Sequence, residues 1–197
     1  ISDCLVGSEM CIRDSYMRDA NVSGADVTFF RYVDWILTVP LMCVEFYLIL
    51  AKAGATKKLM WQLIGLSTVM LVAGYIGETG DSPVLYGTIS GIAYFVMVGM
   101  LWLGSPKALA EKAGGSVLEA YNALCWFILV GWSIYPIGYM IGTDGWYDFV
   151  DAIPLDMDVV YNIGDAINKI GFGLVIYNLA VSKLSLIHIS EPTRQSL

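Results

Sequence analysis

The chain has 197 residues, a formal net charge of −7 and a hydrophobic share of 57%. Soluble domains average about 45–50% apolar residues, so the composition excludes an ordinary soluble domain. The acidic balance argues against a nucleic-acid partner, and the four cysteines show neither metal-ligand spacing nor a disulfide framework. We therefore expect no metal site and no nucleic-acid binding, and we predict an all-α membrane protein.

The two ends of the chain do not match the sequence between them. Residues 1–15 lack the basic-then-apolar order of a targeting segment, and residues 184–197 are out of register with the apolar segment that precedes them. Both stretches resemble translated sequencing-adapter read-through. We predict that 1–15 and 184–197 are non-native, and His188, the only histidine, receives no role.

Between these ends, residues 16–183 form one predicted domain with five apolar segments. A helix needs about 20 residues to cross the hydrocarbon core of a bilayer, which is the length of these segments. Pro136 is expected to kink the fourth of them. The five predicted transmembrane helices are 28–50, 59–76, 84–103, 117–141 and 159–181.

The charges of the connecting segments alternate in sign along the chain. Lysines follow the first, third and fifth segments: Lys52, Lys57, Lys58, Lys107, Lys112 and Lys183. Acidic residues gather in the other connections: Asp19, Asp26, Glu78, Asp81, Asp144, Asp148, Asp151, Asp156 and Asp158. The positive-inside rule places the lysine-bearing loops in the cytoplasm, so the first and fifth segments both begin outside.

A lysine occupies the middle of the fifth segment. A charge at this depth costs roughly 2.5–3.5 kcal/mol on an insertion scale, so Lys169 is a candidate functional residue. Asp165 precedes it by four residues and therefore shares its helix face. A purely structural ion pair is the alternative.

The first segment also carries charges. Arg31, Asp34 and Glu45 fall on or near one helix face together with Thr38. Asp34 and Glu45 are eleven residues apart, or about 16 Å along a helix axis. A lysine joined to an aldehyde as a protonated Schiff base needs carboxylate counter-ions and has a proton to lose. Asp34 can accept that proton and Glu45 can replace it, which makes a directional proton path.

Aromatic residues accompany these charges. Trp132 and Tyr135 lie three residues apart in the fourth segment, and Trp35 follows Asp34. Such residues in a membrane helix more often serve packing than ligand binding. The neighbouring lysine favours a ligand cavity here.

Four stretches together resemble the microbial (type 1) rhodopsins, specifically the proteorhodopsin group, and the similarity covers 16–183. They are 31–41 (RYVDWILTVPL), 44–50 (VEFYLIL), 131–136 (GWSIYP) and 162–173 (NIGDAINKIGFG).

The resemblance implies a role for each candidate residue. Lys169 matches the lysine that binds all-trans retinal, Asp34 the primary counter-ion and proton acceptor, and Asp165 the second counter-ion. Arg31 matches the arginine beneath them, and Glu45 the cytoplasmic proton donor. The retinal-pocket positions are Trp35, Thr38, Met42, Tyr94, Trp132, Tyr135 and Pro136.

Met42 stands at the family's colour-tuning position, where glutamine accompanies blue absorption and apolar residues accompany green. We therefore expect green absorption. The family fold is a seven-helix bundle, of which this chain supplies the five helices C to G. We accordingly expect the activity to belong to a longer parent chain.

The resemblance implies a light-driven outward proton pump rather than an enzyme. It resides in the bacterial inner membrane, and its partners are lipid, retinal, protons and, as one option, further copies of the chain. A photosensory rhodopsin is the nearest alternative, and a structural membrane protein or an inactive fragment is a more distant one. The carboxylic acid at Glu45 favours pumping, because a sensor gains little from fast reprotonation.

Overall fold

The computed structural model describes residues 27–141, 143 and 157–189, and every regular element in this part of the chain is a helix. The predicted non-native segments lie outside the described residues, apart from 184–189 at the end of the last helix. The elements in chain order are α2 (Thr28–Ala51), α3 (Lys57–Thr79), α4 (Pro83–Leu103), α5 (Ser105–Ala113), α6 (Gly115–Trp126), the π-helix η1 (Phe127–Gly131), α7 (Ile134–Ile141) and α8 (Met157–Ile189).

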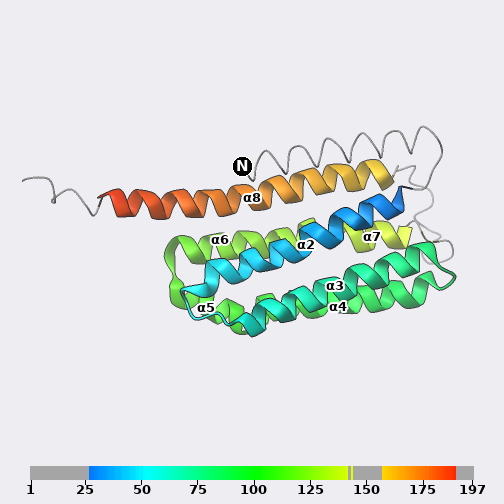
Figure 1. Ribbon diagram of the computed structural model, residues 1–197, viewed down its shortest axis with the longest axis horizontal. Helices are drawn as coiled ribbons and strands as arrows, with labels where there is room; N and C mark the ends of the chain where they lie inside the picture. Colours follow the sequence, from blue (N-terminus) through cyan, green and yellow to red (C-terminus); the bar gives the residue numbers. More distant parts are fainter. Residues whose placement is uncertain (1–26, 142, 144–156, 190–197) are drawn as a thin grey trace, which may run out of the picture.

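Five stretches are long and apolar enough to cross a membrane, which confirms the predicted fold class. They correspond to α2, to α3, to α4 with α5, to α6 through α7, and to α8. Figure 1 shows these spans lying side by side, with α3 and α4 along one side of α2 and with α8 along the other. α3 packs against both α2 and α4, whereas α8 packs against α6, η1 and α7.

Proline and glycine set several of the helix boundaries. Proline stands at the start of α4 and of α5, where its missing N–H is not needed by the helix. Gly114 has φ +63°, a conformation that favours glycine, and it reverses the chain between α5 and α6. The third span is thereby followed directly by the fourth.

The fourth span differs from the continuous kinked helix expected over 117–141. Its α-helical hydrogen bonding stops at Phe127, nine residues before Pro136, and resumes only at Ile134. The Trp132 N–H bonds the Phe127 carbonyl (3.0 Å), which is the spacing of a π-helix. Pro136 cannot donate to the carbonyl four residues earlier and its ring would clash there, so the helix changes pitch before reaching it.

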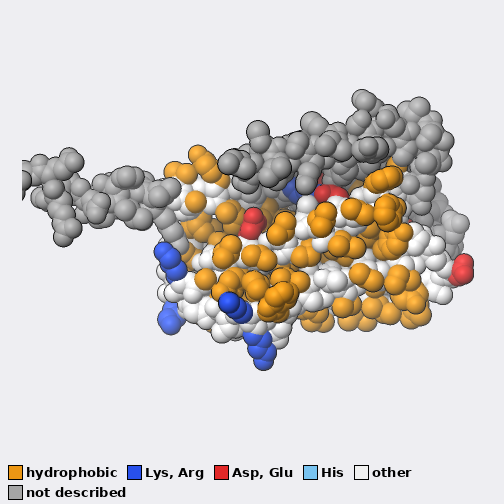
Figure 2. Space-filling model, viewed as in Figure 1, with side chains coloured by type: hydrophobic (Ala, Val, Ile, Leu, Met, Phe, Trp, Pro, Cys, Tyr) orange, Lys and Arg blue, Asp and Glu red, His pale blue; other side chains and the backbone are white. Residues whose placement is uncertain are grey.

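Large apolar side chains cover the outer faces of the spans. Leu37, Leu41, Trp61, Phe95 and Ile167 are all more than half exposed, as expected of surfaces that face lipid. Figure 2 shows hydrophobic side chains along the flank and basic side chains gathered at one end. Arg31, Asp165 and Asn168 are instead buried between the helices.

Candidate functional site

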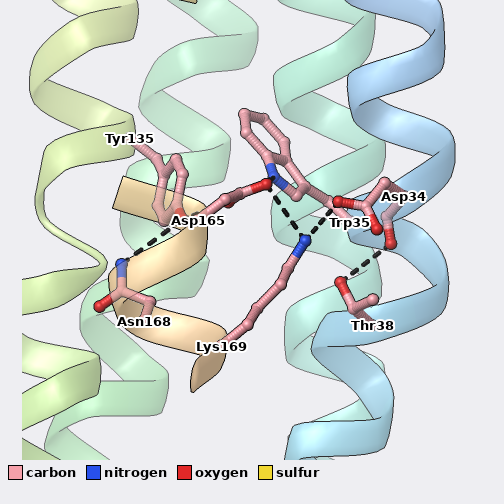
Figure 3. A network of polar contacts seen from close by, with 7 residues as sticks. All are labelled: Asp34, Trp35, Thr38, Tyr135, Asp165, Asn168 and Lys169. Carbon is pink, nitrogen blue, oxygen red and sulfur yellow. Dashed lines mark hydrogen bonds and ion pairs between the residues drawn. The ribbon is translucent and has the colours of Figure 1, made fainter. Parts of the chain in front are cut away.

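Lys169 lies on α8 between two carboxylates from different helices (Figure 3). Its Nζ forms a short ion pair with Asp34 on α2 and a second one, of 3.1 Å, with Asp165 one turn earlier on α8. The three side chains are 19%, 17% and 6% exposed, respectively. Two acids therefore face one buried ammonium, which is more negative charge than a structural pair requires.

Asp165 is held by donors from three helices. The Trp35 Nε1–H lies 3.1 Å from each of its oxygens, and the Tyr135 hydroxyl donates to it as well. Together with Lys169, these donors satisfy a carboxylate that is only 4% exposed. The hydroxyl of Thr38, one turn from Asp34 on α2, bonds the Asp34 backbone carbonyl (2.9 Å).

A cavity of about 320 Å³ begins at this ion-pair cluster, a size within the usual range for small-ligand sites. Its walls come from α2, α3, α4, α7 and α8 and are mostly apolar or aromatic. Six of the seven predicted pocket residues line it, together with Lys169: Trp35, Met42, Tyr94, Trp132, Tyr135 and Pro136. Thr38 does not line the cavity, because its side chain turns back to its own helix.

Arg31 faces a residue that sequence reasoning had assigned to a loop. Its Nη1 forms a 2.9 Å ion pair with Glu78, the penultimate residue of α3. The guanidinium also lies over the ring of Tyr161, 4.8 Å from its centre. A charge at the end of an apolar run resembles a loop charge in sequence, and only the 23-residue length of α3 reveals that Glu78 is helical.

Glu45 lies apart from this cluster on the same helix. Its side chain is half-buried, and it does not line the cavity. It sits three turns from Asp34, next to the fully buried Phe46, whose ring packs against Phe172 (5.7 Å) and Tyr121 (5.8 Å). The two carboxylates therefore occupy separate positions along α2.

Asn168 is a second residue that sequence reasoning did not select. It is 4% exposed and precedes Lys169 directly, and its amide bonds the backbone of the fourth span. A polar residue beside a buried lysine was the available signal. Its partner, the Gly131 carbonyl, was not predictable, because a helix carbonyl is available to a side chain only where the helical hydrogen bonding is broken.

A family model described as "Bacteriorhodopsin-like protein" matches residues 8–183. The chain belongs to this family. It is 44% identical over 177 residues to the blue-light absorbing proteorhodopsin of Gamma-proteobacterium Hot 75m4, covering 86% of this chain and 68% of that protein. It is 42% identical over 176 residues to the green-light absorbing proteorhodopsin of Gamma-proteobacterium EBAC31A08, with the same coverage.

Solved structures agree with this assignment. The blue light-absorbing proteorhodopsin from Med12 superposes with a TM-score of 0.70 at 36% identity, over 91% of this chain and 80% of that one. Xanthorhodopsin, described as a light-driven ion pump with a dual chromophore, gives 0.65 at 31% identity, over 78% and 62%. The chain is thus a multi-pass, light-driven rhodopsin rather than a classical enzyme, and its family implies a retinal chromophore.

Proposed function

We propose that this rhodopsin is a light-driven outward proton pump that carries all-trans retinal on Lys169. The observation that carries the proposal is the buried Nζ, which two carboxylates contact at the edge of an aromatic cavity. A metal or phosphate would need other ligands, and no cluster of metal-binding side chains occurs among the described residues.

The residues present fit retinal. The cavity starts at an amine that can form a covalent bond, and Trp35, Trp132 and Tyr135 supply flat apolar walls beyond it. When bound, retinal supplies light-driven isomerisation and a protonated Schiff-base nitrogen at Lys169. Met42 lines the same cavity and is 8% exposed, so it is well placed to influence absorption, and we propose green absorption.

The two carboxylates next to Lys169 are suited to different tasks. Asp165 receives hydrogen bonds from Trp35 and Tyr135 as well as the contact with Lys169, so we assign it as the lasting counter-ion. Asp34 contacts Nζ from the other helix, α2, and we assign it as the acceptor of the Nζ proton. Arg31, paired to Glu78, supplies a fixed positive charge beyond the acceptor.

Glu45 is assigned as the donor that returns a proton to Nζ from the opposite side. The direction of transport follows from the ends of the bundle. Lys52, Lys57 and Lys107 lie at the Glu45 end of the spans, and Figure 2 shows this basic end. The positive-inside rule makes it the cytoplasmic end, in the inner membrane of a bacterium. Protons would then leave towards Arg31, which is outward.

Illumination of cells that express the chain with added all-trans retinal tests the proposal. We expect a visible absorption band and a sustained acidification of the medium, and Lys169→Ala should abolish both. Tyr177→Phe on the lipid-facing side of the same helix is the matched control and should retain both. A band without sustained acidification would favour a photosensory rhodopsin, and an absence of any band would overturn the retinal assignment.

A further inference from the structure

The break in the fourth span redirects its backbone hydrogen bonds. In a continuous α-helix, the Tyr135 N–H would donate to the carbonyl of Gly131. Here it bonds Trp132 instead (3.2 Å), and the Trp132 N–H bonds Phe127. The carbonyls of Ile128 and Leu129 both accept from the Tyr94 hydroxyl, at 2.9 and 3.0 Å. The broken segment is therefore bonded sideways, to neighbouring helices.

The Gly131 carbonyl obtains its donor from the helix that carries the lysine. The Asn168 Nδ2–H bonds it at 3.0 Å and lies 3.5 Å from the Tyr135 hydroxyl. A carbonyl can only accept, so it fixes which end of the amide faces it. Asn168 is 4% exposed and adjoins Lys169, so one buried side chain joins the lysine-bearing turn to the broken turn.

Glycines allow the fourth span and α8 to approach closely at this contact. A Cβ atom at Gly131 would lie 1.9 Å from Asn168 Oδ1 and 2.9 Å from its Cγ, so only glycine fits opposite the amide. A second such contact follows one turn later, where a Cβ at Gly171 would lie 2.4 Å from the ring of Phe127. These two contacts flank Lys169 on either side.

We propose that Asn168 is a positioning residue that couples Lys169 to the aromatic wall of the cavity. Trp132 and Tyr135 follow the broken turn directly, so the bond to Gly131 sets the distance between the lysine and this wall. The two then move as one unit when the chromophore changes shape. This inference rests on the proposed attachment of retinal to Lys169.

A double-mutant cycle tests the coupling, using the full chain with added all-trans retinal. Asn168→Ala removes the donor, and Gly131→Ala displaces the amide while leaving it in the sequence. We expect each variant to shift the visible band and to change its dark-recovery rate after a flash about tenfold, if the free energy of one buried hydrogen bond enters the recovery barrier. The double variant should add little to either change, because both substitutions break the same bond.

Two controls lie on the same helix. Gly173→Ala enters open space, and Asn178→Ala alters an exposed asparagine, so both should keep the band and the recovery rate of the unmodified chain. Additive shifts in the double variant, or an Asn168→Ala band that matches the Asn178→Ala band, would overturn the proposal.

The same cycle is measured by thermal unfolding of the retinal-free protein. If the double variant loses no more stability than a single variant, the bond between the two turns is supported, even for variants that do not take up retinal. If the stability losses of the single variants add up, the bond is contradicted. If the unmodified chain itself gains no band, the proposed function fails, and the retinal-free cycle still decides the role of Asn168.

Discussion

The two ends of α2 present contrasting environments. Around Asp34, α8 contributes the Lys169 ammonium, which also contacts Asp165. Arg31, one helical turn away from Asp34 on α2, is ion-paired with Glu78. Glu45, three turns further along α2, is half-buried and directly precedes Phe46, whose ring packs against Phe172 and Tyr121. On the proposed path, a proton that leaves Lys169 reaches Asp34 directly, whereas one returning from Glu45 must travel about three helical turns.

The largest expected effect on pumping comes from substitution of Asp34. Asp34→Asn keeps the shape of the side chain but removes the proposed acceptor of the Nζ proton, so light-driven acidification should fall about 10³-fold or more. The measurement is the initial rate of pH change under illumination. Asp81→Asn, at an exposed position, is the control. Undiminished pumping by Asp34→Asn would place the acceptor elsewhere.

A substitution at Glu45 should change the rate of dark recovery and leave the absorption band unchanged. Glu45→Gln removes the proposed proton donor, so the return of the dark spectrum after a flash should slow about 10²-fold while the visible band stays in place. Time-resolved absorption measures this, with the exposed Glu111→Gln as the control. An unchanged recovery time would remove Glu45 from the proton path.

The Arg31–Glu78 ion pair at the Asp34 end of α2 is expected to stabilise the fold. Glu78→Gln removes the charge facing an arginine that is 7% exposed, and the loss should be about 1–3 kcal/mol of unfolding free energy. Thermal or denaturant unfolding measures it, and the exposed Glu119→Gln should change little. Equal stabilities of the two variants would show that this pair contributes nothing to folding.

The smallest effect is expected at Met42. Met42→Gln brings an amide dipole into an apolar stretch of the cavity and should shift the band towards blue without abolishing pumping. The absorption spectrum is the readout, and Met100→Gln, outside the cavity, is the control. A band that stays in place would separate Met42 from colour tuning.

Much of this architecture could be predicted from the sequence because it depends on local rules. The apolar runs have membrane-spanning length, and Asp165 stands one helical turn from Lys169. Asp34 was matched with them because it is one of the few charges in the apolar segments, and the resemblance to a family supported the match, since α2 and α8 are distant in sequence. The break at Phe127–Gly131 was not foreseen, because its hydrogen bonds depend on Tyr94 and Asn168 from other helices. Glu78 was missed because the partner that draws it inward is not adjacent in the chain.

The π-helix also sets the direction in which the following residues point. Its wider turn accommodates one residue more than an α-helix would, and each residue of an α-helix turns the chain by about 100°. Relative to α6, Trp132, Tyr135 and Pro136 are therefore rotated by roughly a quarter of a turn, and all three line the cavity. The number of residues between Phe127 and Gly131 thus selects which face of α7 meets the chromophore, and a straight helix with the same aromatic residues would present a different one.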